Sequence, residues 1–251
     1  MSDIHGCIDA FDEALASVDL SDGTSRLVLL GDYIDRGPAS LRVIRRAMEL
    51  QQRYPGQVIA LRGNHEEMFL EYLDGVLGEE SARAWMLSDS NLATTASFLA
   101  DDEFAHVKHL LRLRDFDGAY QYSIDAMRRN HPDAIAWVRG LPYFYESGEG
   151  QVFVHAGIEE EAGDWWKVGT PDEYFTSMMP DYVGKRFYLD VIAGHVSTET
   201  VSRIPGYQGI WHDGASHYYI DGNVMKNGRV AVLRYDERTQ RYSGEGLDED
   251  A

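Results

Sequence analysis

Five short clusters of Asp, His, Asn and Gly residues are the part of the sequence best suited to chemistry. They occupy residues 3–6 (DIHG), 31–38 (GDYIDRGP), 63–66 (GNHE), 155–157 (HAG) and 194–195 (GH). Carboxylates, imidazoles and an amide oxygen form a mixed ligand set that suits Mn²⁺, Fe²⁺ or Zn²⁺, unlike a thiolate site. A pair of such ions about 3.5–4 Å apart clamps the attacking and leaving oxygens of a phosphoryl displacement. The clusters therefore predict a two-metal site that hydrolyses phosphate esters.

Two residues of these clusters suggest specific roles from their chemistry. Asp32 is the natural bridge between two cations, because one carboxylate has two oxygens. Bound cations lower the pKa of water from about 15.7 towards 7, which makes hydroxide available at neutral pH. His65 titrates in the range that suits proton donation near pH 7, and a carboxylate partner would fix its tautomer. We therefore expect Asp32 to bridge the cations and His65 to act as the general acid.

The elements around the clusters indicate an α/β fold. Apolar runs at 27–30 and 58–61 end at Gly31 and Gly63 and predict buried strands. Between them, residues 39–53 predict a helix with apolar residues on one face and basic residues on the other. Strand–helix–strand order favours parallel pairing, and ligands bind beyond the carboxyl ends of such strands. The spacing therefore predicts that the clusters converge on one site.

The rest of the chain predicts a helical insertion followed by further strands. Residues 66–145 are helical in pattern and rich in Leu, Met and acidic residues, which predicts a cap inserted into the fold. Short β-type runs return at 152–154, 187–193, 217–220 and 230–235. We expect a single domain over 1–251, with an acidic, frayed tail at 244–251.

Composition limits the class of partner. The 23 basic and 42 acidic residues give a formal charge of −19, which repels nucleic-acid polymers and phospholipid headgroups. A single cysteine, Cys7, excludes an internal disulfide and favours a reducing compartment. With no apolar run of membrane-spanning length and no signal peptide pattern, we expect a cytoplasmic location and no membrane partner.

The ordered set DxHG, GDxxDRG, GNHE, HAG and GH resembles the signature of the calcineurin-like metallophosphoesterase superfamily. GDYIDRG and GNHE look like its bacterial serine/threonine phosphoprotein phosphatase branch, and residues 219–222 resemble that family's closing strand and turn. The resemblance implies a β-sandwich of mixed sheets flanked by helices, with the helical cap as an insertion.

The resemblance also implies roles for individual residues. Asp3, His5 and Asp32 would hold the first metal, and the second would be held by Asp32, Asn64, His155 and His195. His65 would protonate the leaving alcohol, and Asp35 would orient His65. Arg36 would contact the phosphate, whose oxygens match the planar guanidinium fork. Asn64 and His65 would also contact the substrate. Two divalent ions are implied, Mn²⁺ first, with iron and zinc as alternatives.

Three functions remain open on these grounds. The leading hypothesis is a serine/threonine protein phosphatase that uses a metal-bridging hydroxide for in-line attack on phosphorus. The alternative is a diadenosine polyphosphate or other nucleotide hydrolase with the same metal site. A non-catalytic module that binds phosphorylated ligands is third, and the pairing of His65 with Asp35 speaks against it, since binding alone needs no proton donor.

The sequence departs from the family pattern in three places. One is the 91-residue separation of Asn64 and His155, which leaves space for the helical cap. The family places a strand before the first motif, whereas two residues precede Asp3 here, so either the start given is late or Asp3 lies on a fraying end. A second phosphate-clamping arginine is expected before the final motif, where the candidates are Lys185 and Arg186. His212 and His217 lie near the final strands, and we expect them to belong to loops.

Overall fold

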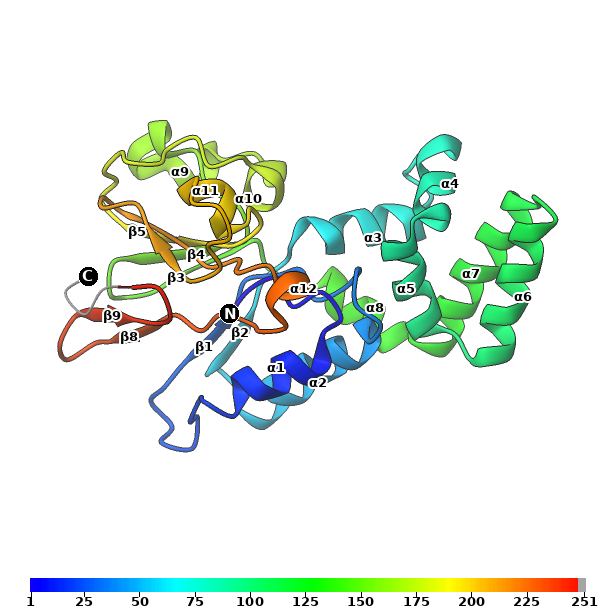
Figure 1. The fold of residues 1–251 in the computed structure, drawn as a ribbon, viewed down its shortest axis with the longest axis horizontal. Helices are drawn as coiled ribbons and strands as arrows, with labels where there is room; N and C mark the ends of the chain where they lie inside the picture. Colours follow the sequence, from blue (N-terminus) through cyan, green and yellow to red (C-terminus); the bar gives the residue numbers. More distant parts are fainter. Residues whose placement is uncertain (248–251) are drawn as a thin grey trace.

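The computed structural model describes residues 1–247 as a layered α/β sandwich with a helical arm (Figure 1). A parallel pair, β1 (Leu27–Leu29) and β2 (Val58–Ala60), packs against α1 (Ile8–Leu15) and α2 (Ser40–Arg53). The second sheet has the order β3-β4-β5-β7-β6. Its strands are β3 (Phe144–Glu146), β4 (Gln151–Val154), β5 (Asp190–Ala193), β6 (Trp211–His212) and β7 (His217–Tyr219).

The second sheet is mixed and is covered on its outer face by short helices. β4, β5 and β7 are parallel neighbours, while β3 and β6 pair antiparallel at the two edges. The neighbouring helical segments are η1 (Glu160–Trp165), α9 (Trp166–Gly169), α10 (Asp172–Ser177) and α11 (Thr198–Ser202). α12 (Val224–Asn227) and the antiparallel hairpin of β8 (Arg234–Asp236) and β9 (Arg241–Ser243) complete the described chain.

Alternation along the strands builds the sandwich. Successive side chains of a strand point to opposite faces, so each strand contributes to two cores. In β1, Leu27 and Leu29 join the core under α1 and α2, whereas Val28 faces the core between the sheets. In β5, Val191 lies in the outer core and Ile192 faces inward. The mixed α/β sandwich expected from the sequence is thus confirmed.

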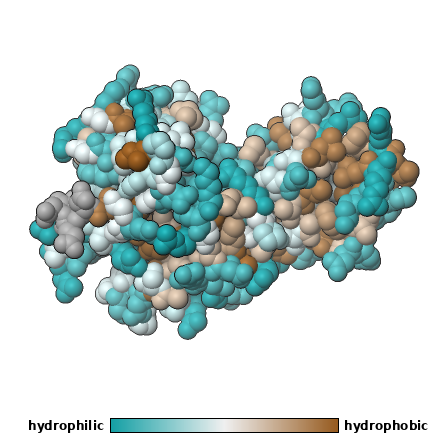
Figure 2. All heavy atoms as spheres, in the orientation of Figure 1, coloured by the Kyte–Doolittle hydropathy of each residue, from teal (hydrophilic) through white to brown (hydrophobic). Residues whose placement is uncertain are grey.

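Six helices lie between β2 and β3 and form the arm. They are α3 (Asn64–Asp74), α4 (Glu79–Leu87), α5 (Asp89–Phe98), α6 (Asp101–Arg112), α7 (Phe116–Asn130) and α8 (Pro132–Arg139). α3 starts at the sandwich, α8 returns to it, and α4 to α7 extend away from it (Figure 1). Figure 2 shows hydrophilic side chains over much of the sandwich and apolar ones gathered over the far end of the arm. Leu87 at the end of α4 and Leu113 directly after α6 are exposed.

The model refines several predicted element bounds. The run predicted at 187–193 forms a strand only from Asp190. The N–H of Phe187 donates to the side-chain oxygen of Ser216 instead of to the backbone of a neighbouring strand. The run at 230–235 is a strand only from Arg234. His212 lies in β6 and His217 in β7, where His217 is buried, which corrects the expectation that both belong to loops. Residues 248–251 of the predicted tail lie outside the described residues. Among residues 1–247, no helix combines the length and the apolar character of a membrane span.

The N-terminal segment is held in place, contrary to the expectation of a fraying Asp3. The terminal ammonium of Met1 donates to Val28 O at 3.0 Å, and Leu30 N–H donates to Met1 O at 2.9 Å. Asp3 N–H donates to Gly31 O at 3.2 Å, and Asp3 is only 2% exposed. Pairing with the β1 segment therefore fixes Asp3 against the sheet.

Candidate metal centre

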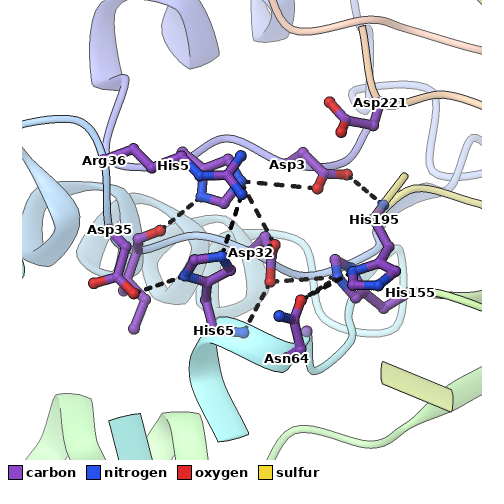
Figure 3. A network of polar contacts seen from close by, with 12 residues as sticks. Asp3, His5, Asp32, Asp35, Arg36, Asn64, His65, His155, His195 and Asp221 are labelled. Atoms are coloured by element: carbon purple, nitrogen blue, oxygen red, sulfur yellow. Dashed lines mark hydrogen bonds and ion pairs between the residues drawn. The ribbon is translucent and has the colours of Figure 1, made fainter. Parts of the chain in front are cut away.

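The structure brings the predicted site residues together at the carboxyl ends of the parallel strands (Figure 3). Asp32 and its neighbours follow β1, Asn64 and His65 open α3 after β2, His155 follows β4, and His195 follows β5. The N-terminal loop reaches the same edge, because His5 N–H donates to Asp32 O at 2.8 Å. Sheet topology thus gathers five loops that are far apart in sequence.

Six of the candidate residues adopt left-handed backbone conformations that are uncommon outside glycine. They have φ between 45° and 68° and are Asp3, His5, Asp32, Asp35, Arg36 and His195. Such conformations cost roughly 1–3 kcal/mol each and persist only where the surroundings hold them. Their concentration at one edge of the sheet indicates that backbone strain is used here to aim side chains at a common point.

Asp32 lies between two groups of donor atoms. Its Oδ2 is 3.5 Å from His5 Nε2, and its Oδ1 is 3.4 Å from His155 Nε2. Asp3 Oδ1 is 3.9 Å from His5 Nε2. Ligand atoms of Asp3, Asp32 and His155 lie within 4.8 Å of one another, as do those of His5, Asp32 and His65. Each oxygen of Asp32 therefore faces a different cluster, an arrangement suited to a bridging carboxylate.

Asn64 completes the second group. Its Oδ1 lies 3.1 Å from His155 Nε2 and 3.1 Å from His195 Nδ1. The other ring nitrogen of His155 is occupied, since Nδ1 donates to Leu30 O at 2.9 Å. His5 is oriented in the same way through Nδ1 and Ile34 O at 2.9 Å. These backbone contacts leave Nε2 of both rings free to present a lone pair to a cation.

The electrostatics of the cluster fit divalent cations. Asp3 Oδ1 and His5 Nε2 are buried without a hydrogen-bond partner among the described residues, which is costly unless another group satisfies them. Burial raises the pKa of Asp32 well above its usual value, and the neighbouring Asp3 and Glu66 raise it further. Burial lowers the pKa of His5 to about 3, so its ring is neutral and able to ligate. Cations would offset the buried negative charge, and the donors present suit Mn²⁺, iron or zinc.

His65 and Asp35 form a hydrogen-bonded pair at the rim of the centre. His65 Nδ1 lies 2.7 Å from Asp35 Oδ2, and Asp35 is fully buried. His65 Nε2 is 3.8 Å from Asp32 Oδ2 and 3.4 Å from Arg36 Nη2. Asp35 therefore fixes the ring so that Nε2 points towards the space beside Asp32, the geometry expected of a candidate proton donor.

Within residues 1–247, Arg36 makes no contact with a second arginine. Lys185 and Arg186 are exposed, and neither contacts a candidate ligand among the described residues. Lys185 instead places its Nζ 4.8 Å from the centroid of the Tyr182 ring. The phosphate clamp that the sequence suggested for Lys185 or Arg186 is therefore not formed in this structure.

Glu66 supports the centre although sequence reasoning gave it no role. Its Oε2 accepts the N–H groups of Asp32 at 2.8 Å and Gly63 at 2.9 Å, and its Oε1 accepts that of Tyr33 at 2.8 Å. Glu66 is the third residue of α3, so its contact with Gly63 is half of a capping box, a spacing visible in the sequence. Glu66 thus holds both the start of α3 and the backbone of Asp32, the candidate bridging residue.

Asp221 is a second residue that sequence reasoning left without a role. It is 5% exposed and lies beside Asp3 (Figure 3). Burial, followed by the charge of Asp3, raises the pKa of Asp221 well above its usual value. Asp221 follows the predicted strand at 217–220, just as the other clusters follow their strands, and this position was the feature of the sequence that could have identified it as a site residue.

A hollow of about 580 Å³ opens beside Asn64. Its lining includes the acidic Glu67, Glu71 and Glu173 and contains no Lys or Arg. A larger hollow of about 840 Å³ lies between β1, β3 and the β8–β9 hairpin, but its lining includes none of the candidate ligands. The smaller hollow is therefore the candidate site for the part of a substrate that extends from the metals.

Comparison with known proteins supports a phosphate ester chemistry. A family model described as calcineurin-like phosphoesterase matches residues 1–210. The chain is 40% identical to a symmetrical bis(5'-nucleosyl)-tetraphosphatase of Delftia acidovorans over an aligned segment of 76 residues. This segment covers 30% of this chain and 26% of that protein. It is also 38% identical to the serine/threonine-protein phosphatase 6 catalytic subunit of Drosophila melanogaster over 52 residues. That segment covers 21% of this chain and 17% of the Drosophila protein.

Similarity to solved structures extends over the whole chain. A crystal structure described as a candidate diadenosine tetraphosphatase aligns with a TM-score of 0.56 and 16% identity, and the alignment covers 98% of this chain and 92% of that one. At this identity the likeness shows the fold. The curated sequence relatives are matched over only 17–46% of their own length.

Proposed function

The chain belongs to the calcineurin-like phosphoesterase family, a family of dinuclear metal phosphoesterases, and we propose that it removes phosphate from phosphoserine and phosphothreonine in proteins. We further propose that Asp3, His5 and Asp32 hold one divalent cation. Asp32, Asn64, His155 and His195 hold the other. The donor set combines carboxylate and amide oxygens with imidazole nitrogens and holds no thiolate, which suits Mn²⁺, the ion that we propose first.

The proposed chemistry divides between the cations and the side chains. When bound, two divalent cations polarise phosphoryl oxygens and lower the pKa of water. Arg36 binds the phosphate from the open side, since its guanidinium is exposed and lies 3.4 Å from His65. His65 gives the proton from Nε2 to the leaving alkoxide, while Asp35 holds Nδ1 at 2.7 Å. Alkoxides are strong bases, so a positioned proton donor suits an alcohol leaving group.

The acidic lining of the hollow beside Asn64 is the observation that favours a phosphopeptide over a polyphosphate as the substrate. Glu71 and Glu173 are exposed and have no side-chain partner among the described residues. They repel a chain of phosphates and attract cationic side chains over the Debye length of about 8 Å in physiological salt. A phosphopeptide with basic residues near the phosphorylated position fits this hollow better than a polyphosphate.

A second candidate function is symmetrical hydrolysis of a dinucleoside tetraphosphate. The names of the relative from Delftia acidovorans and of the structural neighbour favour it. Nucleotide leaving groups depart as phosphate anions, which need less help from a proton donor than an alkoxide does. This candidate therefore predicts only a weak dependence of turnover on His65.

A direct comparison of substrates tests the proposal. With Mn²⁺ present, kcat/KM is measured for a phosphothreonine peptide flanked by arginines, the same peptide flanked by glutamates, and diadenosine tetraphosphate. We expect the arginine peptide to be hydrolysed at least about ten times faster than either of the others. Faster release of ADP from the dinucleotide than of phosphate from either peptide would replace the proposal with the second candidate. The Glu71→Gln and Glu173→Gln variants should reduce the preference between the peptides without altering metal content.

A further inference from the structure

One helix of the arm is hydrogen-bonded to the loop that carries Asp35 and Arg36. The Oγ1 of Thr94, in α5, donates to Asp35 Oδ1 at 2.5 Å and accepts the Asp35 N–H at 2.9 Å. Ser90, one helical turn earlier, accepts the Arg36 N–H through its carbonyl at 3.2 Å and through Oγ at 3.0 Å. Thr94 and Asp35 are both fully buried, so water does not compete for the contacts between them, whereas the contact of Ser90 with Arg36 is exposed.

These contacts fall on the most strained part of the loop. Asp35 and Arg36 are consecutive non-glycine residues with φ of 68° and 66°. Each left-handed conformation costs roughly 1–3 kcal/mol, so the pair needs partners that hold both N–H groups in place. Thr94 and Ser90 are such partners, and Ser40 is a third, since its Oγ accepts the Asp35 N–H at 3.1 Å.

Thr94 also fixes the rotation of the Asp35 carboxylate. One oxygen, Oδ2, contacts His65 Nδ1 at 2.7 Å, and the other, Oδ1, accepts from Thr94. Asp35 is fully buried, so its carboxylate has no solvent to replace a lost partner. Without the Thr94 hydroxyl, the carboxylate would be free to turn, and the His65 ring would lose its fixed direction.

We propose that Thr94 is a positioning residue for proton transfer, through which the helical arm aligns His65 by way of Asp35. The inference rests on the proposed function in one respect, namely that His65 protonates the leaving group. It assigns a role in turnover to a residue 59 positions away from Asp35 in the chain and outside all five motifs.

Leaving-group dependence separates this role from a merely structural one. Phenyl phosphate and 4-nitrophenyl phosphate differ in the basicity of the leaving phenolate, and the more basic phenolate needs the proton more. Removing the hydroxyl in Thr94→Val should lower kcat about 10–100-fold on phenyl phosphate but less than about 3-fold on 4-nitrophenyl phosphate. Thr94→Ser keeps the hydroxyl and should restore kcat on phenyl phosphate to within about 3-fold of wild type.

Ser97→Ala is the matched control on the same helix. Ser97 Oγ accepts the Leu41 N–H at 3.2 Å and donates to the carbonyl oxygen of Thr94 at 2.8 Å. Among residues 1–247 its side chain has no hydrogen bond to Asp35, so its loss disturbs α5 and the backbone of Thr94 but leaves the Thr94 hydroxyl and the Asp35–His65 pair in place. This variant should keep the wild-type ratio of kcat values on the two esters. Metal content and melting temperature, measured for each variant, identify any loss of fold.

A double-mutant cycle with His65→Ala completes the test. If Thr94 acts through His65, Thr94→Val should lower kcat on phenyl phosphate less than about 2-fold in the His65→Ala background. Equal losses on the two esters, or an undiminished loss without His65, would overturn the proposal. Both esters are simple monoesters, so these outcomes do not depend on whether the physiological substrate is a phosphopeptide, which the peptide comparison decides separately.

Discussion

Glu66→Gln is the substitution that most directly tests how the fold supports the metal centre. The carboxylate of Glu66 is fully buried and accepts three backbone N–H groups, from Asp32, Tyr33 and Gly63. Glutamine keeps the size of the side chain but replaces one acceptor oxygen with an NH₂ group. Its oxygen can take the place of Oε2 and keep two N–H partners, which leaves the NH₂ facing the N–H of Tyr33.

The expected loss follows from this geometry. A hydrogen bond to a charged group contributes about 1.5–3 kcal/mol, and a buried donor left without a partner costs about 1–3 kcal/mol. Burial raises the pKa of Glu66, so removing the charge recovers part of that loss. We therefore expect the free energy of unfolding to fall by about 2 kcal/mol, which lowers the melting temperature by about 4–8 °C for a chain of this size.

Thermal unfolding with a chelator present measures this effect without a contribution from metals. Isothermal titration with Mn²⁺ then measures the metal affinity, which should fall about 10-fold because the N–H groups that position Asp32 and Asn64 lose their anchor. Glu13→Gln is the control, since Glu13 is exposed on α1 and has no side-chain hydrogen bond among the described residues. A melting temperature and a Mn²⁺ affinity both equal to those of wild type would refute the anchoring role of Glu66.

Three further predictions concern the bridge, the proton donor and a buried histidine. Asp32→Asn should lower the occupancy of both metals, measured by elemental analysis, and unchanged two-metal content would exclude the bridge. His65→Ala should keep its metals but lose about 10²–10⁴-fold in kcat on phenyl phosphate; wild-type turnover would remove His65 from the mechanism. Burial opposes the charge of His217, but the hydrogen bonds that its ring donates to Asp213 and Glu160, at 2.6 and 2.7 Å, raise its pKa to about 9. This contribution, at most about 3 kcal/mol, is complete below the ordinary histidine pKa of about 6.5 and is lost as pH rises through 9. The free energy of unfolding, measured with urea at pH 6.5 and 10, should fall between these pH values in wild type and fall less in His217→Gln. An equal fall in both proteins would contradict the role of His217.

The sequence alone was sufficient to predict the helices and strands that have strong local patterns. The runs at 27–30 and 58–61 became β1 and β2, and the amphipathic pattern at 39–53 became α2. Their apolar residues recur at the periods of a strand and a helix, and such periods depend only on near neighbours. The order of the motifs likewise predicted the family and the convergence of Asp32, Asn64 and His155 at one edge. The roles of these residues as ligands stay predictions.

Contacts between distant segments required the tertiary structure. Thr94 meets Asp35 across 59 residues, and nothing in the helical pattern of α5 distinguishes this threonine from a solvent-facing one. The edge strands β3 and β6, at most three residues long, carry too few residues to show a period. The burial of Asp3 depends on backbone pairing with Gly31, and the acidic hollow depends on α3 meeting α10. Local sequence determines which residues can form a strand, a helix or a ligand group, whereas long-range packing decides which of them meet.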